Sequence, residues 1–258
     1  MLQEYRISDN GKIVIEDKIE MAIERLKEFE PPEGYALAFS GGKDSMVVYD
    51  LAKRAGVNYR PHYNLTTVDP PELVQFIKKQ YPEVKFNKPK MSMWQLILHK
   101  GFPPTRVVRY CCHILKEGGG KGYNTITGVR WAESSKRSKR RTVETCLNKR
   151  MITVNPILDW TDEDVWAYIH SRELPYCSLY DEGFKRLGCI MCPMSGKMGM
   201  LREANRWPKY YDAYLRTFDK MIASGGETYD RWSTGQDVMI WWIYNPEKGD
   251  PDQGVLFE

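Results

Sequence analysis

The 258-residue sequence lacks the features that mark membrane, secreted or fibrous proteins. It has no uninterrupted run of about 18 apolar residues, which a membrane span needs, and its first residues show no basic stretch followed by an apolar one, as a secretion signal would. It contains no internal repeat and no low-complexity tract. A large excess of one charge sign is also lacking, because 38 basic and 34 acidic residues leave a net charge of only +4. This net charge by itself implies no polyanionic partner. We expect a cytoplasmic globular protein without membrane contact.

Cysteine is present but sparse, with six residues in the chain. A cytosolic compartment keeps thiols reduced, so these cysteines are not expected to form a disulfide framework. Their spacing indicates metal binding or chemistry instead.

Short apolar runs alternate with helical patterns along the first two thirds of the chain. An opening amphipathic helix is predicted over residues 14–29, followed by strands at 35–39, 59–65, 84–87, 124–129 and 151–154 and helices at 46–54, 72–80, 93–99 and 161–172. This alternation predicts an α/β fold, with a parallel five-stranded sheet flanked by helices. Beyond Pro175 the alternation ends, and a helix at 207–223 follows a cysteine-bearing loop. We therefore predict a nucleotide-binding domain over residues 1–175 and a helical, cysteine-bearing segment over 176–258.

A glycine-rich hexapeptide lies where the first buried strand gives way to a helix. Its residues are Ser40, Gly41, Gly42, Lys43, Asp44 and Ser45. Backbone N–H groups and the helix dipole converge on an anion at such a junction, and small residues let the backbone approach phosphate oxygens. The spacing is not that of a Walker A loop. The simpler interpretation is a glycine turn before a helix.

The hexapeptide resembles the SGGxDS signature of the PP-loop ATP pyrophosphatases, also described as adenine nucleotide alpha hydrolase-like. By that resemblance residues 40–45 would bind the pyrophosphate end of ATP. Lys43 would offset developing negative charge, and Asp44 would help to hold Mg²⁺.

Four or five of the cysteines have the spacing of a metal centre. Cys111 and Cys112 are adjacent, and Cys189 and Cys192 form a CxxC motif 77 residues after Cys112. Four converging thiolates suit an iron–sulfur cluster or zinc. Cys177 offers an alternative, because Cys177, Cys189 and Cys192 with Cys111 would also make four ligands. The sequence does not choose between these sets.

The paired cysteines resemble those of the cluster-binding branch of the phosphoadenosine phosphosulfate (PAPS) reductase family, which holds a [4Fe-4S] cluster. Three further stretches resemble that family: GVRWAESSKR at 128–137, NPILDWTDEDVW at 155–166 and LYDEGFKRLGC at 179–189. The resemblance covers about residues 35–195. It implies that Gly128 and Arg130 border the nucleotide and that Lys43, Asp44, Arg130 and Arg137 act in catalysis.

Two departures from the assimilatory reductases point to ATP use. Those reductases attack the sulfonucleotide with a cysteine near the C-terminus, whereas no cysteine follows Cys192 here, and their phosphate loop tends to be degenerate, whereas this one is intact. The chain looks closer to members that pair an ATP loop with a cluster, such as DNA phosphorothioation proteins and tRNA thiolases. We therefore predict ATP-dependent sulfur transfer to a nucleic acid or a small molecule, with a sulfur donor protein as partner and a homo-oligomeric assembly.

Two other functions stay open. The first is a sulfonucleotide reductase that takes adenylyl sulfate or its 3′-phosphate, releases sulfite with thioredoxin, and replaces the missing thiol with Cys177, Cys146 or a partner protein. The second is a non-catalytic module that binds a nucleotide or a nucleic acid and holds a structural zinc.

A dense basic run follows the Gly128 segment. Its five cations are Lys136, Arg137, Lys139, Arg140 and Arg141. A solvated loop is one interpretation; contact with the nucleotide phosphates or with a nucleic-acid backbone is the other. For Trp232, Trp241 and Trp242 we expect packing of the C-terminal segment rather than base stacking.

Overall fold

The chain starts with a two-stranded antiparallel sheet where a longer helix was expected. In the computed structural model, which describes residues 2–7, 13–116, 122–146, 151–225 and 231–244, strands β1 (Gln3–Ile7) and β2 (Ile13–Asp17) pair with each other. The helix predicted from residue 14 is α1 (Lys18–Glu28), and the Asp17 side chain caps it by accepting from the N–H of Ile19 at 2.8 Å. The β-branched run at residues 13–15 favours a strand, and the cap fixes where the helix begins.

A six-stranded sheet forms the centre of the first unit. Its strand order is β5-β4-β3-β6-β8-β7, with β3 (Tyr35–Ala38), β4 (Tyr59–Asn64), β5 (Lys85–Asn87), β6 (Thr125–Ile126), β7 (Val143–Cys146) and β8 (Met151–Val154). The pairs β3–β4, β3–β6 and β6–β8 are parallel, whereas β7 pairs antiparallel with β8. The mainly parallel α/β fold is confirmed, and the sheet gains one edge strand beyond the five expected.

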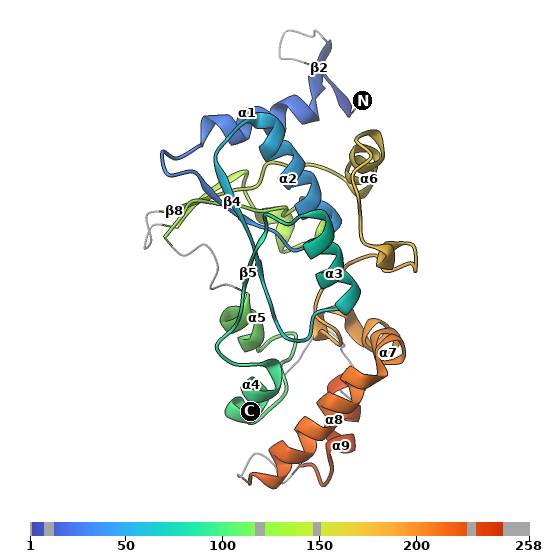
Figure 1. Cartoon of the computed structure of the whole chain (residues 1–258). Helices are drawn as coiled ribbons and strands as arrows, with labels where there is room; N and C mark the ends of the chain where they lie inside the picture. Colours follow the sequence, from blue (N-terminus) through green and yellow to red (C-terminus); the bar gives the residue numbers. More distant parts are fainter. Residues whose placement is uncertain (1, 8–12, 117–121, 147–150, 226–230, 245–258) are drawn as a thin grey trace. The chain divides into compact units, whose positions relative to one another are not determined.

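Helices pack beside this sheet. They are α2 (Lys43–Ala55), α3 (Pro71–Gln80) and α6 (Asp162–Ser171), with the short 3₁₀ helices η1 (Trp131–Glu133), η2 (Arg137–Lys139) and η3 (Ser178–Tyr180). Helix α2 contacts both α1 and α6 (Figure 1). Leu37 of β3 and Met46 and Leu51 of α2 are completely buried, so this helix is anchored in the core beneath the loop that precedes it.

The second unit is helical. Its elements are α4 (Met93–Lys100), α5 (Tyr110–Leu115), η4 (Pro193–Ser195), α7 (Gly196–Arg206), α8 (Pro208–Ala223) and α9 (Gly235–Tyr244). Helix α8 packs against α4, α7 and α9. Trp241 and Trp242 are buried, and Trp242 Nε1 donates to the Pro104 carbonyl at 2.6 Å, which confirms the expected packing role of these two side chains.

The two units are interleaved in the sequence. The first comprises Met1–Tyr63, Pro71–Asn87 and Gly119–Leu187, and the second Asn64–Pro70, Lys88–Gly118 and Gly188–Glu258. The division into domains at residue 175 stays a prediction. Within the described ranges, no helix combines the length and apolar character that crossing a membrane would require. Residues 245–258, the end of the chain, where the reductases would carry their attacking cysteine, lie outside the described residues.

Candidate functional site

The glycine-rich loop has a backbone that only glycine fits at its second position. Gly41 has φ of +71°, and a Cβ there would lie 2.7 Å from the side chains of Leu73 and Ile77 on α3. A larger residue would combine left-handed strain with a clash. The loop is therefore pressed against α3, with its backbone rather than side chains lining the turn.

Two serines hold the loop closed on itself. The Ser45 hydroxyl donates to the Gly42 carbonyl at 2.8 Å, and the Ser40 N–H donates to Ser45 Oγ at 3.2 Å. Ser40 Oγ lies 3.1 Å from Ser45 Oγ. These bonds join both ends of the hexapeptide and fix the first turn of α2 relative to the end of β3.

The N-cap residue of α2 supplies no capping side chain. Helices α1, α4 and α6 each begin with a capping side chain, whereas α2 begins after Gly42, which has none to offer. The Lys43 N–H donates to the Tyr180 hydroxyl at 2.8 Å. The positive end of the α2 dipole therefore faces a position that an anion can occupy.

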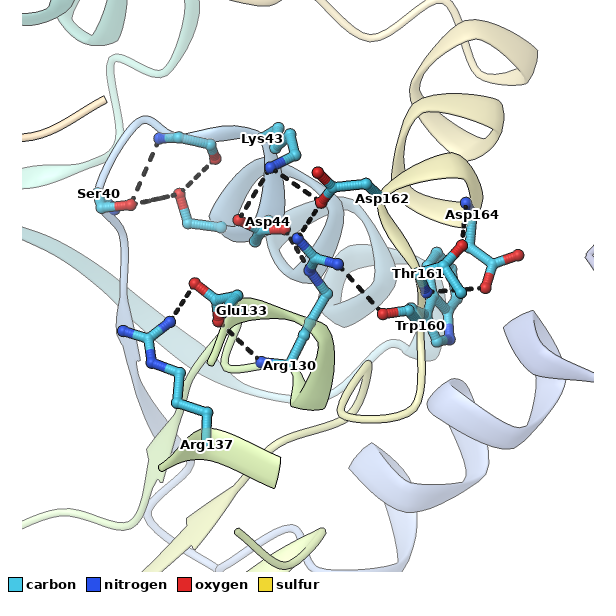
Figure 2. Close-up of polar contacts among 12 residues, drawn as sticks. Ser40, Lys43, Asp44, Arg130, Glu133, Arg137, Trp160, Thr161, Asp162 and Asp164 are labelled. Carbon is cyan, nitrogen blue, oxygen red and sulfur yellow. Dashed lines mark hydrogen bonds and ion pairs between the residues drawn. The ribbon is translucent and has the colours of Figure 1, made fainter. Parts of the chain in front are cut away.

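Arg130 joins two carboxylates beside the loop (Figure 2). Its Nε donates to Asp44 Oδ1 at 2.6 Å, and its Nη2 to Asp162 Oδ1 at 2.5 Å. A third bond runs from Nη1 to the Trp160 carbonyl at 3.1 Å. Only 1% of the residue is exposed and each guanidinium nitrogen donates a hydrogen bond, so Arg130 positions Asp44 and Asp162.

Lys43 lies next to the same two carboxylates. Its Nζ is 3.3 Å from Asp162 Oδ1 and 3.8 Å from Asp44 Oδ2. Only 8% of the Lys43 side chain is exposed, against 60% for Asp162. The ammonium is thus held at the loop by a carboxylate that water can reach.

Gly128 brings a second backbone segment against the start of α2. A Cβ on Gly128 would lie 2.9 Å from the carbonyl carbon of Asp44. This close approach puts the following residue pair, Val129 and Arg130, beside α2, which is why Arg130 can reach Asp44.

The charges in this network shift each other's proton affinity. Burial raises the pKa of Asp44, and the cations Lys43 and Arg130 oppose that shift only in part. For Asp162, burial would also raise the pKa, but hydrogen bonds from Arg130 and Lys43 outweigh it and the pKa is lowered. Asp162 therefore stays ionised as the counter-charge of both cations.

Arg137 is not part of this network. It forms an ion pair with Glu133, whose other oxygen accepts from the Arg130 N–H at 2.9 Å, as Figure 2 shows. About 42% of its side chain is exposed. Its predicted catalytic role stays a prediction.

Four of the five candidate cysteines gather in the second unit. Cys111 interacts electrostatically with Cys112, Cys189 and Cys192. A hydrogen bond from Cys111 lowers the pKa of Cys112, and Arg109 Nη2 lies 3.5 Å from Cys112 Sγ. The Cys189 thiol donates to Thr66 Oγ1 at 3.3 Å.

Cys177 lies in the first unit, in a different environment. It is 1% exposed, burial raises its pKa, and its electrostatic neighbours are Glu72, Asp181 and Glu182. The structure thus brings Cys111, Cys112, Cys189 and Cys192 together in the second unit and places Cys177 in the first.

Two observations on these four cysteines bear on metal binding. Cys189 and Cys192 raise the pKa of Lys116, so a cation accompanies the sulfurs. Within the part of the chain that the structure describes, no three His, Cys, Asp or Glu side chains lie as close together as one metal ion requires.

Sequence reasoning gave no role to three residues of these sites. Asp162 and Tyr180 stand inside stretches that were recognised as motifs, but nothing in their spacing shows that they reach Lys43. Lys116 follows the cysteine pair by four positions and carries no motif at all. Only the folded arrangement reveals them.

A family model for the phosphoadenosine phosphosulfate reductase domain matches residues 34–195. The chain belongs to the PAPS reductase family. An uncharacterised protein of Methanocaldococcus jannaschii is 30% identical over 83% of this chain, which spans 55% of that relative's length. The adenosine 5′-phosphosulfate reductase of Staphylococcus epidermidis is 27% identical, over 76% of this chain and 86% of the relative.

A solved structure was also found. The phosphate complex of the PAPS reductase from Candida auris covers 71% of this chain and 96% of its own, with 18% identity and a TM-score of 0.49.

Proposed function

We propose that this PAPS reductase family protein binds ATP by its phosphates at residues 40–45 and uses it for ATP-dependent sulfur transfer. The observation that carries the proposal is the N-terminus of α2, where the N-cap residue Gly42 offers no side chain and the Lys43 ammonium lies alongside. The N–H groups of a helix N-terminus, the helix dipole and a buried cation at one place are what a pyrophosphate group needs.

Residues of the loop and its neighbours would have different roles in the release of pyrophosphate from ATP. An acceptor oxygen attacks the α-phosphorus, and the bond to the pyrophosphate oxygen breaks. The α2 N–H groups and Lys43 stabilise the charge that develops on the leaving pyrophosphate. Asp44 would supply a carboxylate oxygen to Mg²⁺, which binds through one or two carboxylates and the substrate phosphates. Arg130 holds Asp44 in place for that role.

Lys43 changes partner in this scheme. In the structure its Nζ is 3.3 Å from Asp162, and a phosphate oxygen would compete with that carboxylate. Because most of the Asp162 side chain is exposed, water can take over its solvation when Lys43 turns to the phosphate. A sulfur nucleophile from a donor protein then displaces AMP from the activated acceptor.

Cys111, Cys112, Cys189 and Cys192 would hold a [4Fe-4S] cluster. Four soft thiolate donors accompanied by Arg109 and Lys116 fit a cluster, whose net charge cations offset. A single zinc ion, held by the same four thiolates with Zn–S bonds of about 2.3 Å, is the alternative metal. When bound, the cluster supplies electron-transfer or sulfur-ligand chemistry.

A sulfonucleotide reductase is the second candidate, since relatives with 26–30% identity are named adenosine 5′-phosphosulfate reductases. In that case the loop would bind the phosphate of adenylyl sulfate, and thioredoxin would supply electrons. Sulfite release from adenylyl sulfate distinguishes this reaction from pyrophosphate release.

The nucleotide site is tested by calorimetric titration with Mg-ATP. Lys43→Ala should weaken binding at least about 10-fold, as expected for loss of a charged hydrogen bond. Lys53→Ala, an exposed lysine at the far end of the same helix, should bind like the unaltered protein. Equal affinity in both variants would contradict the proposed site.

The cluster is tested by anaerobic purification with iron, zinc and sulfide analysis. We expect about four irons and four sulfides per chain, lost in Cys112→Ser and retained in Cys177→Ser. Retention in Cys112→Ser, or loss in Cys177→Ser alone, would show that the ligand set is wrong. One zinc without sulfide would favour a structural metal.

A further inference from the structure

An exposed tryptophan stands at the edge of the nucleotide site. Trp131 is 44% exposed, which is unusual for so large an apolar side chain. Its Nε1 donates to the Arg140 carbonyl at 2.8 Å, and its N–H donates to the Leu158 carbonyl at the same distance. The ring is therefore held in one orientation with part of its surface open.

Three basic residues that form no ion pair in the described part of the chain follow Trp131 in the sequence. Of the five basic residues at 136–141, Arg137 pairs with Glu133 and Arg140 with Glu144. Lys136, Lys139 and Arg141 are exposed and form no ion pair with any residue in the described ranges. We call Trp131 with these three cations the Trp131 platform.

The platform is tied to the sheet. The Arg141 carbonyl accepts from Asn155 Nδ2 at 2.8 Å, and the Asn155 N–H donates to the Thr142 carbonyl at 2.7 Å. Asn155 is completely buried directly after β8. Arg141 thus projects from an anchored backbone, so that binding a ligand would cost little ordering of this end of the platform.

The platform also adjoins the phosphate loop. Trp131 directly follows Arg130, whose side chain reaches Asp44 in the first turn of α2 (Figure 2). A molecule bound over Trp131 would therefore lie beside the place proposed for ATP.

We propose that the Trp131 platform binds single-stranded nucleic acid, with a base stacked on Trp131 and backbone phosphates on Lys136, Lys139 and Arg141. An aromatic face accepts an unpaired base of any sequence, whereas the bases of a duplex are already stacked on each other. Three cations in the segment that contacts the ring can each pair with a phosphate of a strand, which carries one per nucleotide. Binding of the strand does not depend on the proposed function. Only the role of the strand as the acceptor of sulfur rests on it.

Binding is measured with fluorescein-labelled single-stranded DNA and RNA oligonucleotides by fluorescence anisotropy. Trp131→Ala should weaken binding about 10-fold, the effect of losing one stacked base. Trp131→Phe keeps a ring without the N–H and should retain most of the affinity. Tyr123→Ala removes another exposed aromatic of the same unit, 40% exposed, and should change nothing.

The phosphate contacts are measured through the salt dependence of the same binding. Lys136→Gln with Lys139→Gln should lower the slope of log affinity against log salt by about 1.4, since each phosphate contact with a single strand contributes about 0.7. Lys53→Gln with Lys79→Gln removes the same charge from exposed helix positions in the same unit and should leave the slope unchanged.

Three results would overturn the inference: no oligonucleotide binding at low salt, unchanged binding in Trp131→Ala, or preference for a duplex of the same sequence. Lys43→Ala separates this inference from the proposed function, because it should lose ATP affinity and keep oligonucleotide affinity. If ATP does not bind but the strand does, the proposed function fails and the platform stands.

Discussion

Replacing Arg130 by methionine should destabilise the first unit markedly, because it leaves Asp44 without its main partner. The guanidinium makes three hydrogen bonds, two of them to carboxylates at 2.5 and 2.6 Å, and is almost fully buried. Methionine fills a similar volume without a charge. The perturbation is therefore electrostatic rather than a loss of packing.

The magnitude follows from the exposure of the two carboxylates. Removing one partner of a buried ion pair costs about 3–5 kcal/mol. Asp162, with 60% of its side chain exposed, can be solvated by water, whereas Asp44 is only 22% exposed. One carboxylate rather than two is stranded, so we expect a loss of about 3 kcal/mol, at the lower end of that range.

Urea unfolding followed by intrinsic fluorescence measures this loss. Arg137→Met is the matched control, since it breaks an exposed pair in the same segment and should cost under about 1 kcal/mol. Adding Asp44→Asn to Arg130→Met should recover part of the stability, because both members of the pair are then uncharged. The reasoning is refuted if Arg130→Met costs no more than Arg137→Met, or if the two single losses simply add.

Three further variants test the loop and the cap of α6. Gly41→Ala should destabilise more than Gly56→Ala: both have φ of +71°, but a Cβ would clash at 2.7 Å only at Gly41, and equal urea midpoints would contradict this. Thr161→Ala should lower the unfolding free energy by about 1 kcal/mol through loss of the capping bond, and an unchanged midpoint would show that the cap contributes nothing. Burial would raise the pKa of Asp164, but the bond from Lys18 outweighs it and the pKa is lowered. The stability it provides is thus present above pH 4 and lost as pH falls through the folded-state value, and midpoints measured from pH 7 to pH 3 should fall less steeply in Asp164→Asn.

Local patterns in the sequence predict much of the first unit. The strand at residues 35–39, the glycine-rich loop and the helix after it were predicted, because buried strands, glycine turns and amphipathic periods are encoded over a few residues. The helix expected over residues 161–172 was predicted for the same reason and is α6, with Thr161 as its N-cap. The helix expected over residues 14–29 starts four residues late, where a capping aspartate follows a β-branched run.

Arrangements that depend on distant parts of the chain were not predictable. The bond from Arg130 to Asp44 joins residues 86 positions apart, and the antiparallel edge strand β7 depends on pairing with β8. Spacing alone could not separate Cys177 from the other cysteines. Its position in the first unit follows from how η3 packs against α3, not from its distance in sequence to Cys189.

The most direct test of ATP-dependent sulfur transfer is to measure which products one anaerobic preparation of the protein forms. The protein is incubated with Mg-ATP and a single-stranded acceptor, and separately with adenylyl sulfate and thioredoxin, and both pyrophosphate and sulfite are measured. We predict pyrophosphate release from ATP that Lys43→Ala abolishes and Lys53→Ala does not. Sulfite release from adenylyl sulfate, with no pyrophosphate from ATP, would contradict ATP-dependent sulfur transfer and assign the chain to the sulfonucleotide reductases.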